Sequence, residues 1–172
     1  MSYKTKLPNI KAFVFDVDGV FTDGSIYLMP DGSMSRVMNV LDGYAVVKAL
    51  RKDYKIGIIT GGEDPMVKNR LQYLGVTDYY PKSADKLKDY EDFKQRYQLK
   101  DEEILTMGDD LPDIPMMKAS AIATCPPNAV AEVKAIAQHI SPVEGGKGAV
   151  REVIEQVLKA QNQWVEDDTK SV

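Results

Sequence analysis

The chain has 172 residues, of which 44% are hydrophobic and 28% charged, and its formal net charge at pH 7 is −4. This length and composition suit one ordinary globular domain. The acidic balance argues against nucleic acid or an anionic membrane as a partner. The single cysteine, Cys125, excludes an internal disulfide, and no segment approaches the ~20 apolar residues of a membrane span. We therefore expect a soluble, cytoplasmic protein.

Short apolar runs alternate with amphipathic segments along the chain. The runs typical of buried strands are 11–15, 55–60, 78–81, 104–107 and 121–124, and helical spacing covers 43–52, 65–74, 86–97, 114–118, 130–137 and 148–161. This order predicts an α/β fold, a doubly wound parallel sheet that binds ligands at the carboxyl ends of its strands. We expect one domain over residues 1–161 and a mobile polar tail over 162–172.

One segment, 24–40, interrupts this alternation. Two β-like runs, 25–29 and 33–40, are joined by Pro30-Asp31-Gly32, which is typical of a hairpin turn. An isolated hairpin is only marginally stable in water. The segment is therefore expected to pack on another subunit.

Acidic and hydroxyl side chains follow two of the predicted strands. Asp16 and Asp18 come directly after the first strand, and two acids so close together make sense if a cation lies between them or if they divide acid–base and nucleophilic work. Thr60-Gly61-Gly62 follows the second strand, where a hydroxyl and free backbone N–H groups can hold a phosphate. The alternative for Asp16 and Asp18 is a pair of turn-forming aspartates, and the alternative for Thr60-Gly61-Gly62 is an ordinary glycine turn.

Two further segments contain candidate site residues. Lys86 begins a predicted helix and could neutralise a phosphoryl oxygen, although the local sequence alone favours an ordinary exposed lysine. Asp109, Asp110 and Asp113 follow the strand 104–107. Hard oxygen ligands in this number suit Mg²⁺, and a solvated acidic loop is the alternative.

Taken together, DVDGV at 16–20, IITGG at 58–62, Lys86 and GDDLPD at 108–113 resemble the four motifs of the haloacid dehalogenase-like phosphatases. The resemblance spans nearly the whole chain. It implies an enzyme that hydrolyses a phosphomonoester through an aspartyl-phosphate intermediate.

The roles of individual residues are also implied by this resemblance. Asp16 would be the nucleophile, and Asp18 would act as general acid and base while its backbone carbonyl binds the metal. Thr60 and Lys86 would hold the transferring phosphoryl group. Asp109 would be the third protein ligand to Mg²⁺, supported by Asp110 and Asp113.

Neither gap between the motifs is long enough for a cap domain. The chain therefore resembles the capless phosphatases that act on 3-deoxy-D-manno-octulosonate 8-phosphate and their relatives that act on nonulosonate 9-phosphates. The octulosonate enzymes belong to lipopolysaccharide precursor synthesis. The matching segments are DVDGVFTDGSIY at 16–27, Asn39-Val40-Leu41-Asp42-Gly43, Arg70 and GGKGAVRE at 145–152. The resemblance implies a homotetramer joined by hairpins, with a tail that can reach a neighbouring active site.

The same resemblance implies that residues 39–43, Gly61, Gly62 and Arg70 line the sugar-acid site, because an arginine can bind both oxygens of a carboxylate. A surface ion pair is the alternative for Arg70. Trp164, an aromatic residue in a polar tail, is expected to dock in a neighbouring subunit's cleft.

The chain departs from this pattern at two positions. Gly62 stands where the octulosonate enzymes have an arginine, and Val47 replaces an arginine found in some of them. The nonulosonate enzymes place a glutamate directly after the Thr-Gly pair, whereas here Glu63 comes one residue later. The octulosonate substrate is favoured and the nonulosonate substrate is the alternative. A receiver domain, a non-catalytic sugar-binding module and a phosphomutase are more remote.

Overall fold

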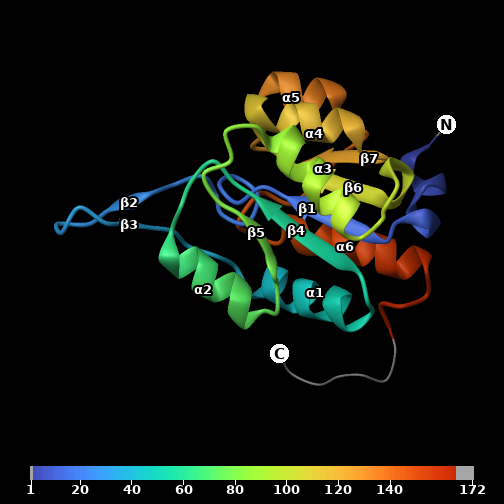
Figure 1. Ribbon diagram of the computed structural model, residues 1–172, viewed down its shortest axis with the longest axis horizontal. Coiled ribbons are helices and arrows are strands. Elements are labelled where there is room, and N and C mark those ends of the chain that lie inside the picture. Colours follow the sequence, from blue (N-terminus) through green and yellow to red (C-terminus); the bar gives the residue numbers. More distant parts are fainter. Residues whose placement is uncertain (1, 166–172) are drawn as a thin grey trace.

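The computed structural model describes residues 2–165 and contains a six-stranded parallel sheet flanked by helices (Figure 1). The strand order across the sheet is β5-β4-β1-β6-β7-β8. Its strands are β1 (Ala12–Phe15), β4 (Lys55–Ile59), β5 (Asp78–Tyr80), β6 (Ile104–Met107), β7 (Ile122–Cys125) and β8 (His139–Ile140). This is the predicted doubly wound α/β fold, without a cap domain in the part of the chain described.

Helices cover both faces of the sheet. The α-helices are α1 (Val40–Arg51), α2 (Pro65–Tyr73), α3 (Lys86–Arg96), α4 (Ile114–Ala119), α5 (Ala131–Ile136) and α6 (Ala149–Ala160). Short 3₁₀ helices are η1 (Tyr3–Thr5), η2 (Leu7–Asn9), η3 (Asp101–Glu103) and η4 (Leu111–Asp113). None of these helices is both long and apolar enough to cross a membrane, among the residues that the structure describes.

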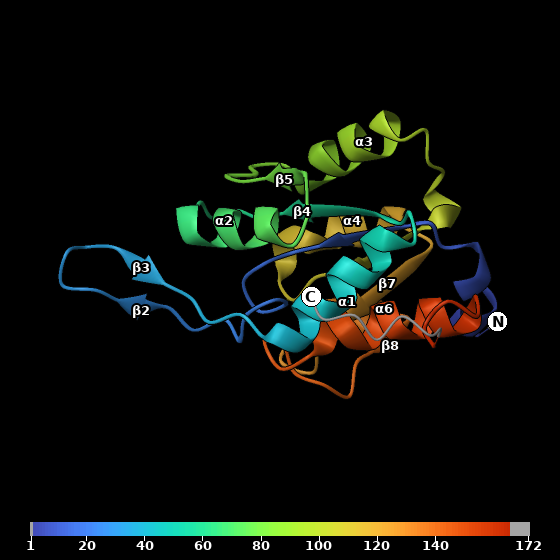
Figure 2. The ribbon, with the colours of Figure 1, turned by 90° about the horizontal axis from the view of Figure 1, so that it is seen from below.

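Side chains alternate between the two faces of each strand, which produces two hydrophobic cores. Phe13 and Phe15 of β1 pack with α1, α2 and α6, whereas Ala12 and Val14 pack with α3, α4 and α5. Figure 2 shows α1 and α6 together on one side of the sheet. Burial on both faces explains why the strands are continuous apolar runs.

Outside the hairpin most boundaries agree with the sequence expectation to within one residue, and two differences are larger. Helix α1 begins at Val40 rather than at residue 43, because the Asn39 side chain accepts a hydrogen bond from Leu41 N at 2.9 Å and caps the helix. The short edge strand β8 was not predicted, since two residues carry no detectable periodicity.

The hairpin is present but shorter than predicted. Its strands are β2 (Tyr27–Leu28) and β3 (Met34–Ser35), so the expected second run, 33–40, is wrong beyond Ser35. It projects from the body of the molecule (Figures 1 and 2). Apolar side chains on it are exposed, including Leu28, which is 80% exposed. Nothing in the described chain covers them.

The tail is described as far as Val165. Trp164 lies against its own chain, with its ring edge-to-face to Tyr44 at 6.1 Å and the Arg151 guanidinium 5.3 Å from its centre. A tail that extends to a neighbouring subunit therefore has to do so either with residues 166–172, which lie outside the described part, or by moving Trp164.

Candidate active site

The sheet reverses its winding direction at β1, and the site lies there, at the carboxyl ends of β1, β4 and β6. Asp16 directly follows β1 and is fixed to β6, since its backbone N–H donates to Met107 O at 3.1 Å. Thr60 directly follows β4 and donates its N–H to Tyr80 O of β5 at 3.0 Å. Asp109 follows β6. Three predicted motifs thus meet at one edge of the sheet.

Three carboxylates converge at this edge. Oxygens of Asp16, Asp109 and Asp113 lie within 4.8 Å of one another. Burial, together with the negative charge of Asp113, raises the pKa of Asp16 to about 7, against the opposing effect of Lys86. Burial, followed by repulsion from Asp113 and Asp110, likewise raises the pKa of Asp109 to about 7. The site is therefore short of positive charge.

Lys86 supplies one positive charge from the first turn of α3. Its Nζ lies 2.9 Å from Asp16 Oδ1 and 2.6 Å from Asp113 Oδ1, and its side chain is only 7% exposed. Burial lowers its pKa, but the two carboxylates outweigh that effect and raise the pKa overall. The alternative of an ordinary exposed lysine does not hold.

Asp113 organises the loop after β6. Its Oδ2 accepts the backbone N–H groups of Asp109 at 2.9 Å and Asp110 at 3.1 Å, while its Oδ1 accepts from Lys86. Asp110 is exposed, and its side chain caps η4 by accepting from Leu111 N at 2.7 Å. Both oxygens of Asp113 thus already accept hydrogen bonds from other groups, whereas fewer donors contact the oxygens of Asp16 and Asp109.

This donor set fits a magnesium ion. Mg²⁺ prefers carboxylate oxygens, usually one or two per site, and retains several waters. Asp16 and Asp109 present such oxygens beside a third carboxylate, and one lysine does not neutralise the three negative charges.

Glycine permits the loop after β1 to approach the acidic cluster. Gly19 has a φ of +83°, and a Cβ atom at this position would lie 2.0 Å from Asp109 Oδ2. Asn128 braces the same loop: its Nδ2 donates to Gly19 O at 2.9 Å and its Oδ1 accepts from Gly145 N at 2.8 Å. The segment 145–152 therefore supports the catalytic loop, a contact that Asn128 mediates and the sequence did not reveal.

Asp18 lies apart from the three-carboxylate cluster and pairs with Arg36, a residue that sequence reasoning missed. Arg36 Nε lies 2.6 Å from Asp18 Oδ1, and its Nη2 lies 3.2 Å from Asp18 Oδ2. Arg36 Nη1 also donates to Asp64 Oδ2 at 3.0 Å. No local pattern marks Arg36, because it follows β3 and approaches the site only in three dimensions.

The turn Thr60-Gly61-Gly62 is built as a compact loop. Thr60 is buried, and its Oγ1 accepts from Gly62 N at 3.3 Å. A Cβ atom at Gly61 would meet no heavy atom within 4 Å, so this side of the turn is open. At Gly62 it would contact Arg36 Nη2 at 3.5 Å, which places this position beside the Asp18–Arg36 pair.

Residues 39–43 are divided between surface and interior. Val40 and Leu41 are exposed, while Asp42 and Gly43 are buried. Asp42 Oδ1 accepts from Arg151 N at 2.8 Å and so joins α1 to α6. Asn39 is occupied as the α1 cap and also donates to Gly146 O at 3.3 Å. Asp42 and Gly43 thus have packing roles, and only Val40 and Leu41 offer a free surface.

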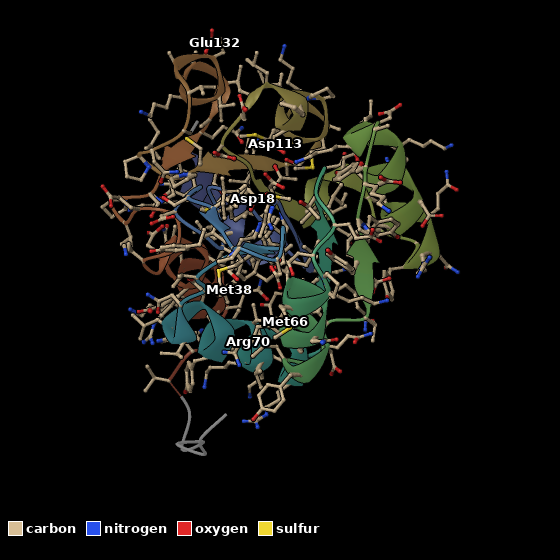
Figure 3. All side chains as sticks on the ribbon, turned by 90° about the vertical axis from the view of Figure 1, so that its left-hand side faces the viewer. Asp18, Met38, Met66, Arg70, Asp113 and Glu132 are labelled. Atoms are coloured by element: carbon tan, nitrogen blue, oxygen red, sulfur yellow. The ribbon has the colours of Figure 1, made fainter. Side chains whose placement is uncertain are left out.

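Arg70 of α2 borders a cavity of about 350 Å³ between α2 and the base of the hairpin. The lining residues are Ser35, Arg36, Met38, Val40, Asp64, Met66, Val67 and Arg70. In Figure 3 the hairpin end of the molecule faces the viewer, with Met38, Met66 and Arg70 on the α1 and α2 side of Asp18. Among the described residues no carboxylate pairs with Arg70, so the alternative of a surface ion pair is not seen.

Comparison with known proteins agrees with this geometry. The family described as haloacid dehalogenase-like hydrolase matches residues 66–154. The 3-deoxy-D-manno-octulosonate 8-phosphate phosphatase KdsC of Escherichia coli K12 is 34% identical over 167 residues, 97% of this chain and 89% of that protein.

Two crystal structures are also similar. The 3-deoxy-D-manno-octulosonate 8-phosphate phosphatase of Yersinia pestis has a TM-score of 0.92 at 33% identity, covering 94% of this chain and 88% of that one. The corresponding enzyme of Moraxella catarrhalis, in complex with magnesium, phosphate and a KDO molecule, has a TM-score of 0.91 at 31% identity, covering 94% and 93%. The chain therefore belongs to the haloacid dehalogenase-like hydrolases.

Proposed function

We propose that this phosphatase hydrolyses 3-deoxy-D-manno-octulosonate 8-phosphate to the free sugar acid and phosphate, a step in making a lipopolysaccharide precursor. The observation that carries the proposal is the buried Asp16, held 2.9 Å from Lys86 at the switch point of a capless fold. The substrate follows from relatives of nearly the same length that are named for it.

In the proposed reaction the Asp16 carboxylate attacks phosphorus, and an aspartyl-phosphate forms as the alkoxide leaves. Asp18 gives a proton to that leaving oxygen. It then takes a proton from the water that attacks phosphorus, which breaks the bond to Asp16 and releases phosphate. Lys86 and Thr60 hold the phosphoryl oxygens. Asp16, Asp109 and the backbone carbonyl of Asp18 would hold Mg²⁺, which would supply the charge neutralisation that a carboxylate needs in order to approach a phosphate dianion. Asp113 and Asp110 support the loop.

The cavity beside Arg70 is the proposed place of the sugar acid. Its volume of about 350 Å³ is in the range of small-molecule sites. Arg70 has no carboxylate partner in the described part of the chain and can bind a substrate carboxylate through both oxygens. Val40 and Met66 supply apolar surface, and Gly61 and Gly62 leave the entrance to the phosphate site open.

The exposed hairpin supports a homotetramer as the functional form. Leu28, at 80% exposure, and Val37, at 60% exposure, would be covered by other subunits. A tail that reaches a neighbouring site remains part of this proposal, through residues beyond Val165. The single buried Cys125 is compatible with a cytoplasmic location.

Phosphate release tests the proposal, measured with Mg²⁺ and with a chelator against octulosonate 8-phosphate, nonulosonate 9-phosphate and hexose phosphates. We expect Mg²⁺-dependent preference for the eight-carbon acid. Preference for the nine-carbon acid would retain the mechanism and change the substrate. Hydrolysis of none of the panel would contradict the proposed function.

A further inference from the structure

Arg36 has an unusual position for a residue of the hairpin. It directly follows β3, yet its side chain is only 7% exposed because it turns inward to the active site. There it makes two contacts with Asp18, at 2.6 and 3.2 Å, and one with Asp64, at 3.0 Å. A buried guanidinium that faces two carboxylates is strongly constrained in orientation.

Asp64 fixes Arg36 from the opposite side. Its Oδ1 caps α2 by accepting from Met66 N at 2.8 Å, which leaves Oδ2 for Arg36 Nη1. The Asp64 side chain is only 9% exposed. The guanidinium is therefore positioned by the first turn of a helix rather than by the exposed part of the hairpin.

Little free space is left beside the Asp18–Arg36 pair. The cavity lined by Asp18, Arg36, Thr60, Gly62 and their neighbours has a volume of about 10 Å³, which is at the lower limit for one water molecule. The Asp18 side chain nevertheless remains 37% exposed. Arg36 thus holds the carboxylate from its inner side, while the lone pairs on its outer side stay accessible to a substrate.

Resting on the proposed function, we infer that Arg36 is a positioning residue for Asp18. Its two-point contact fixes the plane of the carboxylate so that one oxygen faces the leaving oxygen of the substrate. A general acid works only when it is within hydrogen-bond reach of that atom. Gly62 lies directly beside this pair, since a Cβ atom there would be in ordinary van der Waals contact with Arg36 Nη2 at 3.5 Å and Asp18 Oδ2 at 3.6 Å.

The test uses the dependence of the rate on the leaving group. An alkoxide needs a proton in order to leave, whereas p-nitrophenolate departs without one. We would measure kcat/KM, which covers the steps up to departure of the leaving group, with Mg²⁺ for octulosonate 8-phosphate, 2-glycerol phosphate and p-nitrophenyl phosphate. The variants are Arg36→Met, Arg36→Lys and Asp18→Asn. The control is Arg96→Met, which removes an arginine that also pairs with two aspartates, Asp78 and Asp92, outside the site.

For Arg36→Met we expect kcat/KM to fall at least about tenfold for both alkyl phosphates and less than about twofold for p-nitrophenyl phosphate. Asp18→Asn should show the same pattern more strongly, Arg36→Lys should restore part of the loss, and Arg96→Met should change none of the three rates.

An equal loss of kcat/KM for all three substrates in Arg36→Met would indicate structural damage and overturn the inference. A loss confined to octulosonate 8-phosphate would also overturn it, because Arg36 would then be binding the sugar acid. If Asp18→Asn shows the leaving-group pattern and Arg36→Met does not, the inference fails while the proposed function stands. Absence of activity in the wild-type enzyme would instead refute the proposed function.

Discussion

Nζ of Lys86 lies 2.9 Å from Oδ1 of Asp16, and neither side chain is more than 9% exposed. Both charges have lost most of their hydration, and Asp16 depends on Lys86 for compensation, whereas Lys86 also pairs with Asp113 at 2.6 Å. Asp113 and Asp109 add negative charge to the same cluster. One lysine therefore does not supply enough positive charge to neutralise the carboxylates of the site. A divalent cation would compensate the remaining negative charge.

Replacing Lys86 by Met should therefore damage both folding and catalysis. It leaves Asp16 and Asp113 buried without their partner, for which we expect a loss of about 3 kcal/mol in the free energy of unfolding. We also expect turnover to fall at least about 100-fold. Urea denaturation and phosphate release measure the two effects.

Lys159→Met is the matched control for this variant. Lys159 pairs with Glu155 on the surface of α6, and its side chain is 57% exposed, so its loss should change stability by less than about 0.5 kcal/mol. Equal effects of the two substitutions would show that Lys86 is not the central charge of the cluster.

Replacing Asp16 by Asn should separate catalysis from stability. The amide cannot form an acyl phosphate, so turnover should fall at least about 1000-fold. Burial and Asp113 already disfavour the Asp16 carboxylate, as its raised pKa indicates. The neutral amide should therefore be no less stable than the wild type in chelator, as measured by thermal unfolding. Retained turnover in Asp16→Asn would exclude Asp16 as the nucleophile.

The fold could be predicted because its signals are local. The apolar runs of β1, β4, β6 and β7 alternate with amphipathic helices, and the parallel sheet follows from that order. Asp16 and Thr60 directly follow strands, Asp109 follows β6 after one glycine, and Lys86 begins α3. In a doubly wound sheet the carboxyl ends of the parallel strands lie at one edge, so side chains at these positions come together there.

The remainder of the site could not be predicted because it depends on contacts between distant segments. Arg36 reaches Asp18 from the hairpin, and Asn128 joins the loops that contain Gly19 and Gly145. Arg36 lies in the predicted run 33–40, but nothing in that run marks it as a site residue, and Asn128 belongs to no periodic run or glycine motif. The burial of Asp42 between α1 and α6 was likewise not predicted, because helix packing rather than sequence spacing decides which side of a helix start faces solvent.

The affinity for Mg²⁺ should increase with pH. Burial and neighbouring acids raise the pKa of Asp109 to about 7, and its proton must leave before the oxygen can bind a cation. We expect calorimetric titration to give weaker Mg²⁺ binding at pH 6 than at pH 8. Asp109→Asn should bind Mg²⁺ poorly at both values. Equal wild-type affinity at the two pH values would contradict the role of this proton.

Asp42 should make the folded chain less stable as the pH rises. Burial raises its pKa from 3.8 to about 6, against backbone hydrogen bonds from the start of α6. The folded state therefore holds a proton that the unfolded state releases, and this favourable contribution, present below pH 4, is lost as the pH rises through about 6. The difference corresponds to roughly 3 kcal/mol.

Asp42→Asn isolates this effect, because the amide oxygen can still accept from Arg151 N while the charge is removed. The stability gained by the variant over the wild type should be larger at pH 8 than at pH 4, as measured by urea denaturation at both values. Parallel pH profiles for the two proteins would show that Asp42 does not titrate between the folded and unfolded states.

The hairpin should determine the assembly state. Leu28 is 80% exposed on a two-stranded ribbon that is too short to be stable by itself. Leu28→Glu would place a charge in the proposed subunit interface, where burying an unpaired charge is strongly unfavourable. We expect light scattering to show a tetramer for the wild type and smaller species for Leu28→Glu. Tyr73→Glu, which adds the same charge at a 75% exposed residue of α2, should remain tetrameric. A wild-type monomer, or a tetramer that persists in Leu28→Glu, would mean that the hairpin has no role in joining subunits.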